Sequence, residues 1–246
     1  MGEAEAKVAL LAGASGLVGG EVLGALLEAP DFQRVYAVSR RPLGREHARL
    51  ANRIVQFDRL ESQLKGFTCH TAFCCLGSPV GGRVSEQEVR QIEYAYVLAF
   101  ARAAKASQAQ RFVLLSCARV EPGARTADLI AKHDVEEAIT ALGFAALDIL
   151  KPGPLLGLRK QVRVGDLARM LAMPVINPLL TGAREAHRGI SARTVAAAML
   201  GASRSGRRGV YQYTYGGLLG LASAKPQQRP GTQAAARPNK AGQPPR

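Results

Sequence analysis

The stretch Gly13-Ala14-Ser15-Gly16-Leu17-Val18-Gly19 separates an apolar run, Val8 to Ala12, from an amphipathic segment, Glu21 to Leu27. This order predicts a β-strand, a tight turn and the start of a helix. Glycines in such a turn let the backbone approach a phosphate, and the first N–H groups of the helix face the anion. The stretch therefore predicts a site for the pyrophosphate of a dinucleotide.

A second apolar run, Arg34 to Val38, follows at the separation of a βαβ unit, about 20 residues after the glycines. At the end of the second strand, a carboxylate would accept from a ribose 2′-hydroxyl, whereas a cation would meet a 2′-phosphate. Arg40 and Arg41 stand there without a carboxylate. We therefore predict NADP as the cofactor, with NAD as the alternative. The alternative interpretation is that the two arginines only keep a surface loop solvated and do not bind a cofactor.

Further apolar runs alternate with helical segments along the chain, which predicts one α/β domain built on a doubly wound parallel sheet, a Rossmann fold, over residues 1–221. Less regular sequence from Arg159 to Gly189 predicts a small C-terminal insertion on the substrate side of that domain. The expected strands are Ile54 to Phe57, closed by Asp58, then Thr71 to Leu76, Arg111 to Ser116, Ala145 to Leu150 and Val210 to Thr214, and the expected helices are Ser85 to Ala106, Lys132 to Leu142, Asp166 to Ala172 and Ser191 to Ala202.

The formal net charge of +14 is partly carried by a C-terminal segment, residues 222–246, that is rich in Pro, Gly, Gln and Ala. This segment contains five Lys or Arg residues and no acidic residue, and we predict a disordered basic tail. The remaining cations are spread along the chain without an aromatic-rich pattern for stacking bases. Nucleic acid and anionic membranes are therefore only minor alternatives as partners.

The four cysteines, Cys69, Cys74, Cys75 and Cys117, lack the spacing of metal ligands, so we expect no metal site. We expect them to pack as small apolar side chains. The N-terminus carries Glu3 and Glu5 instead of a basic region, and no long apolar run follows. These features predict a cytoplasmic protein.

Several stretches together resemble the atypical branch of the short-chain dehydrogenase/reductase superfamily, with its Tat-interacting-protein-like oxidoreductases and bacterial NAD(P)H-binding relatives. The resemblance covers residues 7–215. It rests on the glycine-rich turn, on Phe73-Cys74-Cys75-Leu76-Gly77-Ser78, on Phe112-Val113-Leu114-Leu115-Ser116, on Lys132 followed by Glu136, and on Lys151-Pro152-Gly153-Pro154-Leu155-Leu156-Gly157-Leu158-Arg159.

The resemblance implies a tyrosine that acts as the general acid/base and a lysine four residues later that lowers its pKa and holds the nicotinamide ribose. The lysine is Lys132, but Asp128 stands at the tyrosine position, and no tyrosine occurs between Tyr96 and Tyr211. An aspartate is a shorter group and cannot match the proton affinity of an alkoxide. Ser116 matches the residue that polarises a carbonyl, whereas Cys117 replaces the usual second serine.

We therefore expect either an NADP-dependent oxidoreductase acting on an unidentified carbonyl or alcohol, or a protein that binds NADPH without hydride transfer. Ser116 and Lys132 are the candidate catalytic residues. The residues expected to contact the cofactor are Gly13, Ser15, Gly16, Leu17, Val18, Gly19, Arg40, Arg41, Asp58, Leu76, Gly77, Ser116, Lys132 and Pro152.

Overall fold

The computed structural model describes residues 7–78, 84–120, 123, 125–156 and 182–224. Within them a seven-stranded sheet has the order β3-β2-β1-β4-β5-β6-β9, and every neighbouring pair is parallel. The strands are β1 (Lys7–Ala12), β2 (Phe32–Ser39), β3 (Leu50–Ile54), β4 (Thr71–Cys74), β5 (Arg111–Leu115), β6 (Ala146–Leu150) and β9 (Gly209–Tyr213). The predicted Rossmann fold is confirmed, since the strand order reverses between β1 and β4.

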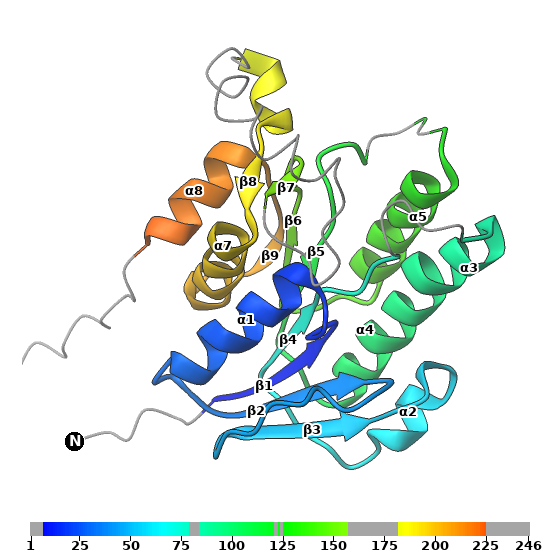
Figure 1. The fold of residues 1–246 in the computed structure, drawn as a ribbon, viewed down its shortest axis with the longest axis vertical. Coiled ribbons are helices and arrows are strands. Elements are labelled where there is room, and N and C mark those ends of the chain that lie inside the picture. Colours follow the sequence, from blue (N-terminus) through cyan, green and yellow to red (C-terminus); the bar gives the residue numbers. More distant parts are fainter. Residues whose placement is uncertain (1–6, 79–83, 121–122, 124, 157–181, 225–246) are drawn as a thin grey trace, which may run out of the picture.

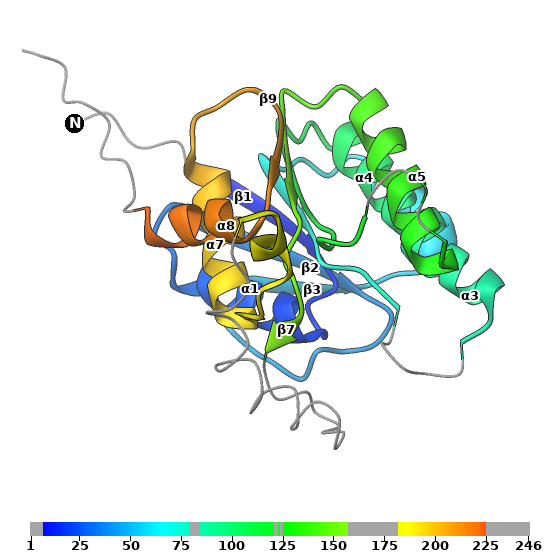
Figure 2. The same cartoon turned by 90° about the horizontal axis from the view of Figure 1, so that it is seen from above.

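Helices cover both faces of this sheet (Figures 1 and 2). One face carries α1 (Leu17–Glu28), α7 (Ala192–Arg204) and α8 (Tyr215–Ser223), and α7 packs against both of the others. The opposite face carries α2 (Leu60–Gln63), α4 (Val97–Ala106) and α5 (Ala127–Ala141). A two-stranded parallel sheet, β7 (Leu155–Leu156) with β8 (Ile190–Ser191), lies apart from the main one.

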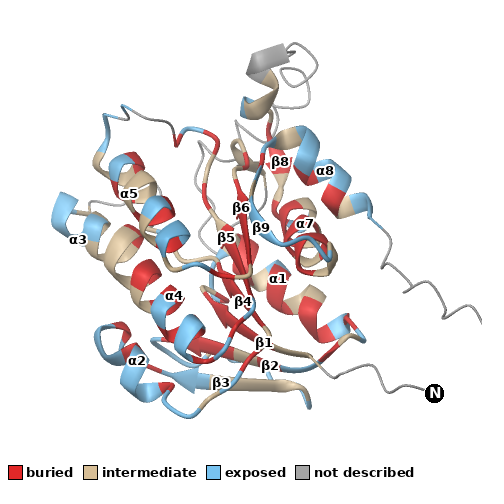
Figure 3. Ribbon diagram, turned by 180° about the vertical axis from the view of Figure 1, so that it is seen from behind, coloured by how far each residue is buried: buried red, intermediate tan, exposed pale blue. Residues whose placement is uncertain are grey.

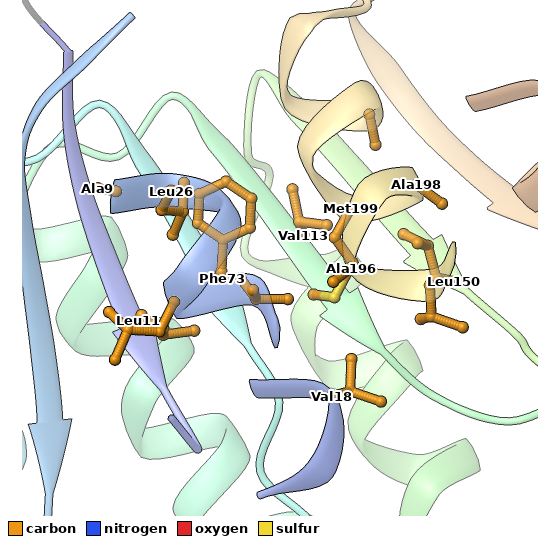
Figure 4. Close-up of a cluster of buried hydrophobic side chains, with 14 of the residues drawn as sticks. Ala9, Leu11, Val18, Leu26, Phe73, Val113, Leu150, Ala196, Ala198 and Met199 are labelled. Carbon is orange, nitrogen blue, oxygen red and sulfur yellow. The ribbon is translucent and has the colours of Figure 1, made fainter. Parts of the chain in front are cut away.

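Alternation along the central strands assigns side chains to these two faces. In β1, Leu11 belongs to the core under α1 and α7, whereas Leu10 belongs to the core under α4 and α5. Figure 4 shows Phe73 and Leu26 in the first of these cores, and Figure 3 shows that the central strands are buried throughout. Because both faces are covered, the strands read as near-continuous apolar runs.

Two adjacent cysteines also point to opposite faces of the sheet. Cys74 lies in the core of the α4 face, while the next residue, Cys75, packs toward α7 with its Sγ 3.7 Å from Sδ of Met199. Burial raises the pKa of Cys69 and Cys74 to about 12. All four cysteines are free thiols.

The helix predicted from Ser85 to Ala106 forms as three joined segments. Ser85 caps α3 (Glu86–Arg90) in a capping box with Glu88. A π-helical segment, η2 (Gln91–Tyr96), follows and leads into α4. A π-helical segment interrupts an α-helix rarely and often at a functional site.

Several predicted boundaries were wrong. The strand predicted from Ile54 to Phe57 is found at Leu50–Ile54, and the chain after it leads into a 3-10 turn, η1 (Phe57–Arg59). Helix α5 begins at Ala127, five residues before the predicted start at Lys132. Helix α8 was not expected, and its last residues, Ala222 and Ser223, were assigned to the disordered tail.

Helix α8 ends at residue 223, and its apolar face, Leu218 and Leu221, packs into the core beside α7. The remainder of the predicted tail, residues 225–246, lies outside the described residues. Most of the predicted insertion does too, including the helix expected from Asp166 to Ala172. At the end of the predicted insertion, the structure describes a 3-10 segment, η4 (Gly182–His187). Among the helices described, none has the length and apolar character required to cross a bilayer.

We expect Phe73→Ala to lower the free energy of unfolding by about 3–5 kcal/mol, because this fully buried ring fills the space between β4 and the helices α1 and α7. Its ring also meets Phe32 edge-on, with centroids 6.0 Å apart. Denaturant unfolding measures the change. Ile54→Ala, on a β3 side chain 53% exposed, is the matched control and should stay within about 0.5 kcal/mol of the parent. Equal effects of the two substitutions would contradict the assigned core.

Candidate functional site

The glycine-rich turn lies where β1 ends and α1 begins, and two of its glycines are required by close packing. Gly13 has φ +85°, and a Cβ atom there would lie 2.3 Å from the carbonyl oxygen of Cys75. A Cβ atom on Gly19 would lie 2.0 Å from the carbonyl oxygen of Gly13. The turn is therefore clamped between the first turn of α1 and the end of β4.

The N-terminus of α1 is arranged for an anion. Its N-cap is Gly16, which supplies no side-chain hydrogen bond, and the first turn contains no acidic residue. Ser15 and Gly16 are exposed, and Leu17 is half-buried. Unpaired N–H groups and the positive end of the helix dipole thus meet solvent at the place predicted for the pyrophosphate. Val18, by contrast, turns its side chain into the core.

The loop after β2 is held by polar contacts beneath the two predicted arginines. Ser39 Oγ donates to the carbonyl oxygen of Arg41 at 2.7 Å, and Asn52 Nδ2 donates to Ser39 Oγ at 2.8 Å. Arg40 and Arg41 are both exposed. Since β1 and β2 are parallel neighbours, these arginines lie at the same edge of the sheet as the glycine-rich turn.

Asp58 does not occupy the strand end at which it was predicted. It lies in η1, is exposed, and accepts a hydrogen bond from Gln91 Nε2 at 3.0 Å. This contact joins the segment after β3 to the start of the π-helical segment. A contact between Asp58 and adenine remains a prediction.

A buried glutamate in η2 connects two of the predicted cofactor segments. Glu93 is only 3% exposed, and its Oε1 accepts from the backbone N–H and the hydroxyl of Ser78, at 2.7 and 2.6 Å. Its other oxygen forms an ion pair with Lys132 Nζ. Gly77 lies beside the same carboxylate, since a Cβ there would be 3.6 Å from Oε1. Lys132 is thus tied to the loop after β4.

A second buried glutamate organises the loops after β5 and β6. Ser116 Oγ donates to Glu136 Oε1, and Lys151 Nζ lies 2.9 Å from Glu136 Oε2. Lys151 Nζ also donates to the carbonyl oxygen of Val120 at 3.3 Å. Ser116 and Glu136 are 8% and 7% exposed. Each glutamate therefore joins one serine at a strand end to one lysine.

Asp128 lies in the first turn of α5, one helical turn before Lys132. Its carboxylate and the Lys132 ammonium both act on the thiol of Cys117. The pKa of that thiol is raised, mainly by burial, with Asp128 raising it further and Lys132 opposing. Asp128 and Lys132 therefore have opposite effects on the thiol that follows Ser116 in the chain.

The remaining predicted contacts also lie at the carboxyl edge of the sheet. Leu76 and Gly77 follow β4, and Pro152 follows β6. The carbonyl oxygen of Pro152 accepts from the backbone N–H of Ala118 at 2.9 Å, which joins the loops after β5 and β6. These predicted contacts thus follow the ends of β4 and β6, and Lys132 on α5 is joined to the loop after β4 through Glu93.

The sequence alone did not identify Glu93, Glu136 or Lys151 as site residues, although Glu136 and Lys151 belong to the stretches that carry the family resemblance. Glu93 falls in a polar helix without a distinguishing local pattern, and only the π-helical segment turns it inward. Lys151 has a clearer signal, because a lysine directly after a buried strand and before Pro152 needs an acidic partner if it is buried.

No family model matches the chain, but individual proteins do. It is 33% identical over 168 residues to Protein HTATIP2 of Rattus norvegicus, an alignment that covers 66% of this chain and 69% of the rat protein. It is 33% identical over 156 residues to the mitochondrial protein FMP52 of Saccharomyces cerevisiae, covering 61% of this chain and 66% of that protein. Since the FMP52 relatives are named as mitochondrial, the predicted cytoplasmic location was wrong on this comparison.

Solved structures share the fold at low sequence identity. The enzyme WbmH of Bordetella bronchiseptica, solved in complex with NAD+, aligns with a TM-score of 0.63 at 15% identity, covering 85% of this chain and 76% of that one. The ADP-L-glycero-D-manno-heptose-6-epimerase of Helicobacter pylori aligns with a TM-score of 0.64 at 14% identity, covering 87% and 78%. Sequence relatives and fold agree: the chain belongs to the atypical short-chain dehydrogenase/reductase family that includes HTATIP2 and the FMP52 proteins.

Proposed function

We propose that the protein is an NADP(H)-dependent oxidoreductase acting on a small carbonyl compound or alcohol. The observation that carries this proposal is the uncapped N-terminus of α1 behind Gly13, at the same sheet edge as Ser116 and Lys132. The similar folds support it, because several structures with this fold were solved in complex with NAD. When bound, the cofactor would supply the hydride.

The residues at this edge suit the parts of the cofactor in order. Backbone N–H groups at the start of α1 would hold the pyrophosphate. Arg40 and Arg41 offer planar guanidinium groups, which bind a 2′-phosphate through paired hydrogen bonds. Lys132 would hold the nicotinamide ribose, with Glu93 fixing the direction of its ammonium group.

Because Asp128 replaces the tyrosine, another group must act as the general acid/base in proton transfer. Ser116 is the hydroxyl best placed for it, and its proton points to Glu136. Glu136 in turn contacts Lys151, whose side chain is 13% exposed. We propose that Ser116 would protonate the alkoxide formed from a carbonyl, that Lys151 would return a proton to Ser116 through Glu136, and that solvent would reprotonate Lys151. This path would remove the need for a phenol at position 128. Asp128 then acts only on the charge around Cys117 and Lys132.

A second candidate function is binding of NADPH without turnover. It is favoured by one observation, the aspartate in place of the tyrosine, which leaves no phenol in the chain between Tyr96 and Tyr211. In that case the protein would sense the cofactor or regulate a partner. The cofactor-binding residues would be the same, and proton transfer through Ser116 would be dispensable.

Calorimetry with NADPH, followed by a screen of carbonyl substrates monitored through NADPH oxidation, tests the two candidates. The oxidoreductase proposal expects binding together with turnover of at least one substrate, and Ser116→Ala should abolish that turnover while leaving NADPH binding intact. Binding without turnover across a broad panel would favour the second candidate. Absence of NADPH and NADH binding would overturn both.

Cofactor selectivity should depend on Arg40. We expect Arg40→Ala to raise the Kd for NADPH about tenfold or more, because it removes a charge-assisted contact to the 2′-phosphate, and to leave the Kd for NADH nearly unchanged. The matched control is Arg34→Ala, an exposed arginine at the opposite end of the same strand, which should change neither value. Equal losses for both cofactors would refute the assignment of NADP.

The role of Lys132 can be separated from its ion pair by a double-mutant cycle. Glu93→Leu alone leaves a lysine without its partner and should lower the free energy of unfolding by about 3–5 kcal/mol. Adding Lys132→Met should restore much of that stability, because the remaining side chains are apolar.

NADPH affinity then decides between the two roles. If Lys132 holds the cofactor, the stable double variant binds NADPH more weakly than the parent by about tenfold. If the pair is only structural, the double variant binds NADPH as the parent does. Unfolding in denaturant and calorimetry give the two readouts independently.

A further inference from the structure

A second hollow lies over the α4 face of β2 and β3, next to the segment that precedes β4 and away from the glycine-rich turn. Its volume is about 450 Å³. Arg34 lines it from the beginning of β2, whereas Arg40 follows the end of that strand. Six residues of extended chain separate these two arginines by about 20 Å. No residue of its lining is among the predicted cofactor contacts, so the hollow is separate from the proposed cofactor site.

The hollow exists because the crossover between β3 and β4 contains little helix. Tyr36 and Arg53 lie on the α4 face of β2 and β3, at the edge of the sheet. The only α-helix in that crossover, α2, has four residues and lies by the carboxyl ends of these strands (Figure 1). The amino-terminal part of this face is therefore left uncovered, and the segment Lys65 to Thr68 forms its rim.

The lining of the hollow carries positive charge only. Arg34, Arg53 and Lys65 contribute cations, and no acidic residue belongs to the lining. Arg34 donates to the carbonyl oxygen of Ala48 at 3.3 Å. Among the described residues, no carboxylate lies within ion-pair distance of any of these three cations. Their charge is unneutralised by side chains, which favours an anionic ligand.

Aromatic rings hold the two guanidinium groups in place. The Arg53 guanidinium lies 5.4 Å from the ring centroid of Tyr36 and 5.5 Å from that of Phe67, and the Arg34 guanidinium lies 5.9 Å from that of Tyr36. The two rings meet edge-on, with centroids 4.6 Å apart. Stacking uses the face of a guanidinium and leaves the N–H groups at its edge free to bind the oxygens of an oxyanion.

We propose that this hollow binds the phosphate group of a small soluble phosphate ester. Two guanidinium groups pre-positioned on aromatic rings, with an ammonium group at the rim, suit an oxyanion with several oxygens. A compact hollow with three cations suits a small ligand, whereas a nucleic-acid strand or a membrane surface requires an extended basic surface. The proposal does not depend on the oxidoreductase function.

Inorganic pyrophosphate is the probe, titrated by calorimetry in the presence of saturating NADPH so that the start of α1 is occupied. If NADPH does not bind, the same titration is made on Arg40→Ala, which leaves the second hollow intact. We expect the double variant R34Q/R53Q to weaken pyrophosphate binding about tenfold or more. Arg53→Lys, which keeps the charge but loses the planar fork, should give an intermediate loss.

The matched control is Arg90→Gln. Arg90 also lies over a ring, 5.0 Å from the Tyr94 centroid, but it pairs with Asp134 at 3.2 Å, so its charge is already compensated. This variant should bind pyrophosphate as the parent does. Thermal unfolding by circular dichroism checks that each variant is folded.

Three results would overturn the proposal: no pyrophosphate binding by the parent protein, equal binding by the parent and R34Q/R53Q, or an equal loss in Arg90→Gln. A further arm replaces pyrophosphate with a single-stranded oligonucleotide or with vesicles containing an anionic phospholipid. Binding of either that is lost in R34Q/R53Q, while pyrophosphate does not bind, would assign the hollow to a macromolecular ligand and contradict the proposal.

Discussion

The contact between Gly13 and Gly19 is the constraint on which the rest of the site depends. The first turn of α1 lies so close to the carbonyl oxygen of Gly13 that a single Cβ atom on Gly19 would collide with it. The same turn abuts the backbone at Cys75, so α1, β1 and the end of β4 meet without side chains between them. This backbone packing leaves the start of α1 uncapped and open to an anion.

Two buried glutamates neutralise the charges of the two lysines at the site. Glu93 and Glu136 are both buried, and each accepts hydrogen bonds from a serine at a strand end and from a lysine. A buried carboxylate without such partners would be costly, so serine, glutamate and lysine stabilise one another as a set. The set also fixes the loops after β4 and β5, which the site requires to be rigid.

The sequence predicted the parallel sheet and most of the strand ends, because buried strands of this fold are apolar on both faces and glycine spacing marks the first turn. It placed Asp58 wrongly, since an apolar run such as Ile54 to Phe57 does not distinguish a strand from a 3-10 turn. It also missed α8, whose glycines and leucines have little periodicity. The partners of Lys132 could not be predicted, because Glu93 is distant in sequence and reaches it only through tertiary packing.

The π-helical segment η2 carries a consequence for how this helix can vary. A π-turn holds one residue more than an α-turn, so the residues on its two sides are offset relative to a continuous α-helix. Glu93 faces Lys132, while Phe100 in α4 faces the core, and both orientations depend on that extra residue. Loss of one residue within Gln91–Tyr96 would let the wide turn close into an ordinary α-turn, and Glu93, which lies inside it, would lose the position from which it reaches Lys132. The length of this helix is therefore under tighter constraint than its mostly exposed first turn suggests.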